Sequence, residues 1–86
     1  MSETHDNRLK RLTMRSMRRG IKEMDIILSR YAELRLSSFD ADMLDRYDAL
    51  LSENDQDLYQ WVSGQKTPPE PLRSMIDDIS NVAFQR

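Results

Sequence analysis

Apolar residues recur along the chain at intervals of three and four positions, which is the spacing of one face of an α-helix. The clearest series runs through Met17, Ile21, Met24, Leu28 and Tyr31. Strand signals are weak, because valine occurs only twice and no stretch alternates apolar with polar residues over the length of a strand. The pattern therefore predicts an all-α protein.

Breaks in this pattern mark the ends of the first helices. Gly20 would cost about 1 kcal/mol relative to alanine inside a helix. We therefore place a boundary there, between a helix at about residues 6–18 and a second helix at about 20–36. A polar cluster follows, in which Asp40 is suited to accept the free backbone N–H groups of a third helix.

The second half of the chain predicts two more short helices. Asp55 is placed to cap the fourth helix, and Gly64 is placed to end it in a left-handed conformation. Residues 67–70 (TPPE) have the form of a capping box with proline in the first turn of a fifth helix. We therefore expect a compact five-helix bundle that forms a single domain over residues 1–86, with residues 1–6 as a flexible tail.

The apolar faces of these helices predict the core. Tyr59 and Trp61 lie two positions apart and point in nearly opposite directions on a helix. One of the two rings is therefore expected in the core and the other on the surface, where a partner can reach it. The remaining positions whose spacing predicts burial are Leu9, Leu12, Met17, Ile21, Met24, Leu28, Tyr31, Leu44, Tyr47, Leu50, Leu51, Leu58, Val62, Leu72, Met75, Ile76, Ile79 and Val82 or Ala83.

The composition excludes several kinds of active site. The 86 residues include no cysteine and one histidine, His5, so thiolate chemistry, disulfides and a histidine-based catalytic or metal site are disfavoured. Two glycines are too few for a glycine-rich phosphate loop. Acidic pairs such as Asp55 and Asp57 stand near predicted helix starts, where they complement the helix dipole. The sequence therefore predicts a protein that is not an enzyme and that binds no metal or cofactor of its own.

Charge is distributed unevenly along the chain. Residues 1–36 hold nine basic and five acidic side chains, whereas residues 37–86 hold four basic and ten acidic ones. Guanidinium groups form paired hydrogen bonds with carboxylates and phosphates, so the arginine-rich first helix predicts a docking surface for an acidic partner. The lack of aromatic residues in this helix and the acidic remainder of the chain disfavour nucleic acid. The cationic patch consists of Arg8, Lys10, Arg11, Arg15, Arg18 and Arg19.

The apolar segments are short. None approaches the ~18 consecutive apolar residues of a membrane-spanning helix, and the first 20 residues lack the apolar run of a secretory signal. These residues are rich in arginine, as mitochondrial presequences are, but Glu3 and Asp6 argue against that interpretation. The sequence predicts a complete cytoplasmic protein without membrane insertion, and we expect a monomer.

Two elements of the sequence resemble a known family. Residues 18–25 (RRGIKEMD) resemble the R-G-x-x-E signature of the FAD assembly factor SdhE family, also known as the succinate dehydrogenase assembly factor 2 family. Residues 11–16 (RLTMRS) are similar to the family's first helix, and residues 55–61 (DQDLYQW) are similar to its D-x-D-L-aromatic-x-W element. The resemblance covers about residues 8–82. Gln56 departs from it, because the family often has proline at this position.

The resemblance implies a function. Members of the family bind the flavoprotein subunit of succinate dehydrogenase, and in some bacteria that of fumarate reductase, and promote covalent attachment of FAD to a histidine of that subunit. The family includes bacterial and mitochondrial members, and with the sequence features above we expect a bacterial protein in the cytoplasm. The partner-binding residues expected from the signature and its surroundings are Arg15, Arg18, Arg19, Gly20, Glu23, Asp25, Tyr59 and Trp61.

The signature suggests a hypothesis for docking. Gly20 would let the backbone approach the partner closely, Arg19 would bond to carboxylate or carbonyl groups of the partner, and Glu23 would orient Arg19. An alternative is a generic helical interaction module, antitoxin-like or an adaptor, that uses the same cationic patch for another acidic protein. A nucleic-acid binder is a further alternative, which predicts an affinity that falls steeply with salt.

Overall fold

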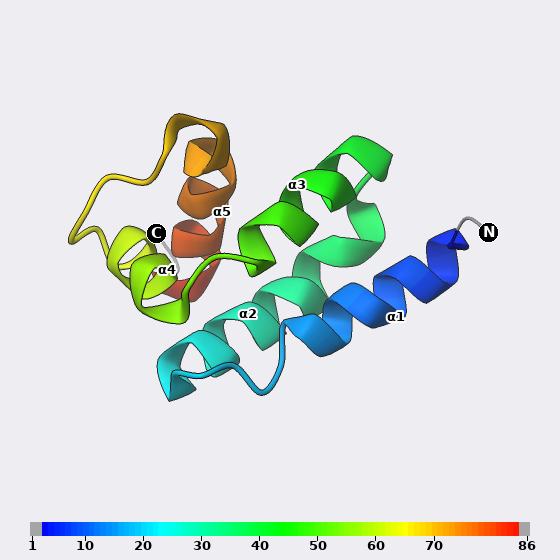
Figure 1. The fold of residues 1–86 in the computed structure, drawn as a ribbon, viewed down its shortest axis with the longest axis horizontal. Helices are drawn as coiled ribbons and strands as arrows, with labels where there is room; N and C mark the ends of the chain where they lie inside the picture. The colour runs from blue at the N-terminus through cyan, green and yellow to red at the C-terminus, as the bar shows by residue number, and fades with distance from the viewer. Residues whose placement is uncertain (1–2, 85–86) are drawn as a thin grey trace.

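The structure is a computed structural model that describes residues 3–84, and within this range it is all-helical, as the sequence predicts. Five α-helices form one bundle (Figure 1). Two short 3-10 turns, η1 and η2, precede α3 and α5. The elements are α1 (His5–Arg15), α2 (Lys22–Arg35), η1 (Leu36–Ser38), α3 (Ala41–Leu51), α4 (Asp55–Val62), η2 (Glu70–Leu72) and α5 (Arg73–Phe84).

Side-chain caps start three of these helices, α1, α3 and α4. The Asp40 carboxylate accepts a hydrogen bond from the Met43 backbone N–H at 2.9 Å, which confirms Asp40 as the cap of α3. The Thr4 hydroxyl accepts one from the Asn7 N–H at 3.1 Å. Because of this cap, α1 begins at His5, inside the segment predicted as a flexible tail. Met1 and Ser2 lie outside the described residues.

The connection between α1 and α2 differs from the predicted boundary. α1 ends at Arg15 rather than at residue 18, and α2 begins at Lys22 rather than at residue 20. The backbone explains the difference, because Arg18 has a left-handed φ of 54° and Ile21 is extended, so a helix cannot run through either residue. Residues 16–21 therefore form a loop, which we call the R-G loop.

The predicted caps at the starts of α4 and α5 are both wrong. Asn54 caps α4, since its side chain accepts from the Gln56 N–H at 2.8 Å, while Asp55 is the first residue of the helix. The predicted capping box before α5 is absent, and the chain enters that helix through η2, which has no side-chain cap. Gly64 has φ 85° and confirms the left-handed end of α4.

The arrangement centres on α2. It contacts α1, α4 and α5, and in Figure 1 it runs antiparallel to α1 beside it. α4 and α5 lie together at one end of a molecule that measures 40 × 25 × 23 Å, and α1 points away from them. The R-G loop thereby lies close to the start of α4, although 35 positions in the sequence separate Gly20 from Asp55.

The core follows the apolar pattern, although Leu9, Ile21, Leu72, Val82 and Ala83 are only partly buried and Met17 is exposed. Tyr31 and Tyr47 are fully buried and, with Phe39, form a cluster of three aromatic rings. Met17, which the sequence series places in the core, is 45% exposed because α1 has already ended. The buried apolar residues are Leu12, Met24, Leu28, Tyr31, Ala32, Leu36, Phe39, Leu44, Tyr47, Leu50, Leu51, Leu58, Val62, Met75, Ile76 and Ile79.

Tyr47 makes the stability of the fold sensitive to high pH. Burial raises the pKa of Tyr47 to about 12, above the value of about 10 for an unfolded tyrosine. The stabilisation is therefore complete below about pH 10 and is lost as the pH rises towards 12. We expect the free energy of unfolding, measured by urea titration, to fall over this window. In Tyr47→Phe the fall should be smaller, and an equal fall in the two proteins would contradict this assignment.

Candidate partner-binding site

Arg19, the arginine of the R-G-x-x-E signature, points into the protein. Its Nε donates to Asp55 Oδ1 at 2.8 Å, its Nη1 to the Arg15 carbonyl at 3.0 Å and its Nη2 to the Leu51 carbonyl at 3.1 Å. The Arg19 side chain is 12% exposed and that of Asp55 is 16% exposed. Arg19 is thus occupied by contacts within the chain.

These contacts join the ends of three helices. The Arg15 and Leu51 carbonyls belong to the last turns of α1 and α3, where the helix dipole is negative, and they accept from the cationic guanidinium. Asp55 lies in the first turn of α4, where the dipole favours an acid. Arg19 therefore fixes α1, α3 and the start of α4 relative to one another.

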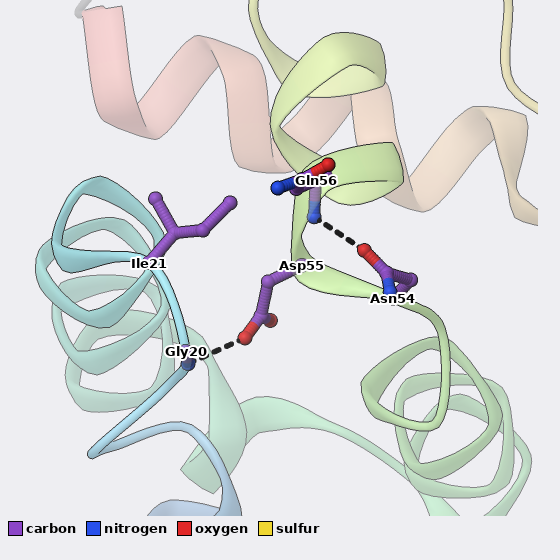
Figure 2. Close-up of a pocket in the computed structure, with 5 residues that line it drawn as sticks. All are labelled: Gly20, Ile21, Asn54, Asp55 and Gln56. Atoms are coloured by element: carbon purple, nitrogen blue, oxygen red, sulfur yellow. Dashed lines mark hydrogen bonds between the residues drawn. The ribbon is translucent and has the colours of Figure 1, made fainter.

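Gly20 uses the same carboxylate. Its backbone N–H donates to Asp55 Oδ2 at 2.6 Å, as Figure 2 shows. A Cβ atom on Gly20 would lie 3.1 Å from that oxygen, tighter than ordinary contacts, so a glycine suits this close approach. We call Arg19, Gly20 and Asp55 the arginine junction. A shallow hollow of about 310 Å³ lies beside it, lined by Gly20, Ile21, Asn54, Asp55 and Gln56 (Figure 2).

Asp25 holds the other side of the R-G loop. Its Oδ1 accepts the Arg18 backbone N–H at 2.9 Å and the Ser29 hydroxyl at 3.3 Å. The Arg18 side chain is exposed, and no residue between 3 and 84 forms a hydrogen bond or an ion pair with it. The loop therefore presents Arg18 to solvent and keeps Arg19 inside.

Glu23 does not orient Arg19 as predicted, because Asp55 does so. Glu23 lies in the first turn of α2 and is exposed, and it has no hydrogen bond or ion pair with the residues that the structure describes. Sequence reasoning assigned Asp55 to a helix cap and missed this second role. Arg19 and Asp55 belong to the two sequence elements that resemble the family. That both elements occur in one chain was the available indication that these residues are in contact.

Most of the cationic patch is paired as well. Arg8 bonds to Asp45, Arg11 to Asp48 at 3.1 Å, and Arg15 to Asp48. The hydrogen bond from Arg11 lowers the pKa of Asp48 below its usual value. These arginines face α3, and its acidic residues neutralise their charge. The predicted cationic surface is therefore limited to the residues of the patch that have no ion pair among residues 3–84.

Tyr59 and Trp61 are both intermediate in solvent exposure. Both are partly buried and both pack against the core cluster. Neither ring is fully enclosed and neither stands free, although the sequence predicted one of each kind. Both lie on α4, the helix whose first residue belongs to the arginine junction.

These features define a class, a small five-helix protein that carries an arginine–glycine pair in the loop between its first two helices. Residues 10–83 match the model of the family described as "flavinator of succinate dehydrogenase", and the chain therefore belongs to this family. The resemblance seen in the sequence is confirmed.

The chain is similar to curated fungal proteins named "succinate dehydrogenase assembly factor 2, mitochondrial". It is 40% identical over 72 residues to that of Schizosaccharomyces pombe, which covers 84% of this chain and 52% of the relative. It is 45% identical over 80 residues to that of Candida glabrata, which covers 92% of this chain and 52% of the relative. The chain thus spans about half the length of these relatives.

The predicted location in the bacterial cytoplasm is contradicted, because the relatives are named mitochondrial and come from fungi. The charges used against a mitochondrial interpretation belong to the folded protein. Glu3 accepts a hydrogen bond from Arg11 Nε at 2.8 Å, and Asp6 lies in the first turn of α1. Both acidic side chains therefore have a place in the fold. Within residues 3–84, every helix is too short or too polar to cross a membrane.

Proposed function

We propose that the protein assists succinate dehydrogenase assembly by binding the flavoprotein subunit and promoting covalent attachment of FAD to it. The observation that carries the proposal is the family match over residues 10–83. The names of the curated relatives support a role in assembly. The two sequence elements that resemble the family also meet in the structure, where Arg19 and Gly20 of the first element bond to Asp55 of the second.

The proposed role is not catalytic. The chain has no cysteine, and its one histidine is His5 in the exposed first turn of α1. The flavin and the histidine that accepts it then both belong to the partner. A binding protein can accelerate such a reaction by holding the reacting groups in place and by excluding water from them. Binding that favours the competent conformation of the subunit shifts its population towards that state.

Gly20→Arg is expected to abolish capture of the flavoprotein subunit while the helices remain. The added side chain starts at a Cβ position already 3.1 Å from Asp55, so it must displace the R-G loop or extend over its outer surface. The measurement is capture of purified flavoprotein subunit by the immobilised chain, followed by flavin fluorescence of the captured band on a denaturing gel. The flavoprotein subunit of fumarate reductase is tested for capture in the same way.

Ser37→Arg is the matched control, because it adds the same charge at an exposed position of η1. It should capture the subunit as the unmodified protein does, and circular dichroism should show the same helix content in all three proteins. If the unmodified protein captures neither flavoprotein subunit, the proposed function is wrong. The chain would then be a generic interaction module.

A further inference from the structure

The R-G loop contains one arginine that the fold does not use. Arg18 has φ 54°, a left-handed conformation that costs a non-glycine residue about 1–2 kcal/mol. Glycine or asparagine would adopt it more easily. The exposed side chain contributes no hydrogen bond or ion pair to the part of the chain that the structure describes. Stability therefore does not explain an arginine here, and strained residues are concentrated at functional sites.

The strained conformation is held from both sides. The Arg18 N–H bonds to Asp25 at 2.9 Å, and the next two residues bond to Asp55 through the arginine junction. These contacts fix the backbone before any partner arrives, so the side chain is presented from a preorganised loop. Preorganisation reduces the entropy lost on binding.

The surroundings of Arg18 identify the kind of surface it fits. Met17, its neighbour in the loop, is 45% exposed, and Met14 in the last turn of α1 is 71% exposed. An exposed arginine within four positions of two exposed methionines suits a protein surface that offers a carboxylate and apolar groups, and both residue types are enriched in protein interfaces. Methionine adapts readily to an irregular apolar surface.

We propose that Arg18, with Met14 and Met17, forms the contact surface for the partner, and that the arginine junction is its support. The inference rests on the proposed function, so the occupant is an acidic and apolar patch on the flavoprotein subunit. Arg18 contacts the carboxylate directly. Arg19 and Asp55 act as positioning residues, because they hold the loop without facing the partner.

The variant Arg18→Gly distinguishes a contact between Arg18 and the partner from a contribution of Arg18 to the stability of the fold. Glycine relieves the left-handed backbone, so the thermal midpoint should stay the same or rise. Loss of the guanidinium should weaken binding of the purified flavoprotein subunit about tenfold or more, as measured by calorimetry. Added salt should weaken the binding of the unmodified protein more than that of the variant. Arg18→Lys, which keeps the charge without the planar fork, should bind with intermediate affinity.

Arg30→Ala is the control, because Arg30 is an exposed arginine on α2 that has no ion pair among residues 3–84. It should bind as the unmodified protein does. If the unmodified protein binds the subunit and Arg18→Gly binds equally well, the assignment of Arg18 is wrong and the proposed function stands. If the unmodified protein does not bind the subunit, the proposed function fails, and this inference fails with it.

Discussion

Asp55→Ala is expected to lower the free energy of unfolding by about 2–3 kcal/mol, because it leaves the Arg19 guanidinium largely buried without its counter-charge. The Gly20 N–H loses its acceptor at the same time, so the R-G loop loses both of its contacts with α4. Urea titration followed by circular dichroism measures the loss. Binding of the flavoprotein subunit should fall with it, since the loop is no longer held in place.

Asp57→Ala is the matched control for this change. Asp57 stands on the same helix and has the same side chain, but it is exposed and has no hydrogen bond or ion pair in the described range. Its substitution should alter the free energy of unfolding by about 0.5 kcal/mol or less. Equal losses in the two variants would show that Asp55 acts only through its place at the start of α4.

Tyr31→Ala is expected to cost about 4 kcal/mol, close to the whole stability of a small domain. The Tyr31 ring is fully buried, with its centre 5.8 Å from that of Tyr47 and 6.2 Å from that of Phe39. Removing it opens a cavity where α2 meets α3 and removes two aromatic contacts. We expect a protein that is largely unfolded at 37 °C, as seen by circular dichroism and by the dispersion of its NMR spectrum.

Tyr31→Phe distinguishes packing from hydrogen bonding at this position. The Tyr31 hydroxyl donates to Asp78 Oδ2 at 2.7 Å, and Asp78 also accepts from Arg35 at 3.1 Å. The carboxylate keeps Arg35 in the variant, so the loss should be about 1 kcal/mol. A loss as large as that of Tyr31→Ala would mean that the hydroxyl, and not the ring, dominates the contribution of Tyr31.

Local patterns in the sequence predict much of this fold. Helical spacing alone identifies Leu28 and Tyr31 as core residues, because a surface helix must bury its apolar face. A cap such as Asp40 is equally local, since its acceptor and donor lie three positions apart. Met17 fails the same argument, because the apolar spacing continues past Arg15, where α1 ends.

The candidate site could be predicted only in part. The signature identifies Arg19 and Gly20, but it does not reveal that Arg19 faces inward, because its partner Asp55 lies 36 positions away. Asp55 at the start of a helix has a sufficient local explanation as a cap, so nothing local indicates a tertiary contact. The same holds for Asp48, whose pairing with Arg11 and Arg15 turns an apparent cationic surface into an interface between α1 and α3.

The most direct test of the proposed function is the rate of covalent flavin attachment. Purified flavoprotein subunit without flavin is incubated with FAD, with and without an equimolar amount of this chain, and covalent flavin is read by fluorescence on a denaturing gel over time. We predict that covalent flavin accumulates faster with the chain, and that Gly20→Arg removes the acceleration while Ser37→Arg retains it. Equal rates with and without the chain would contradict the account.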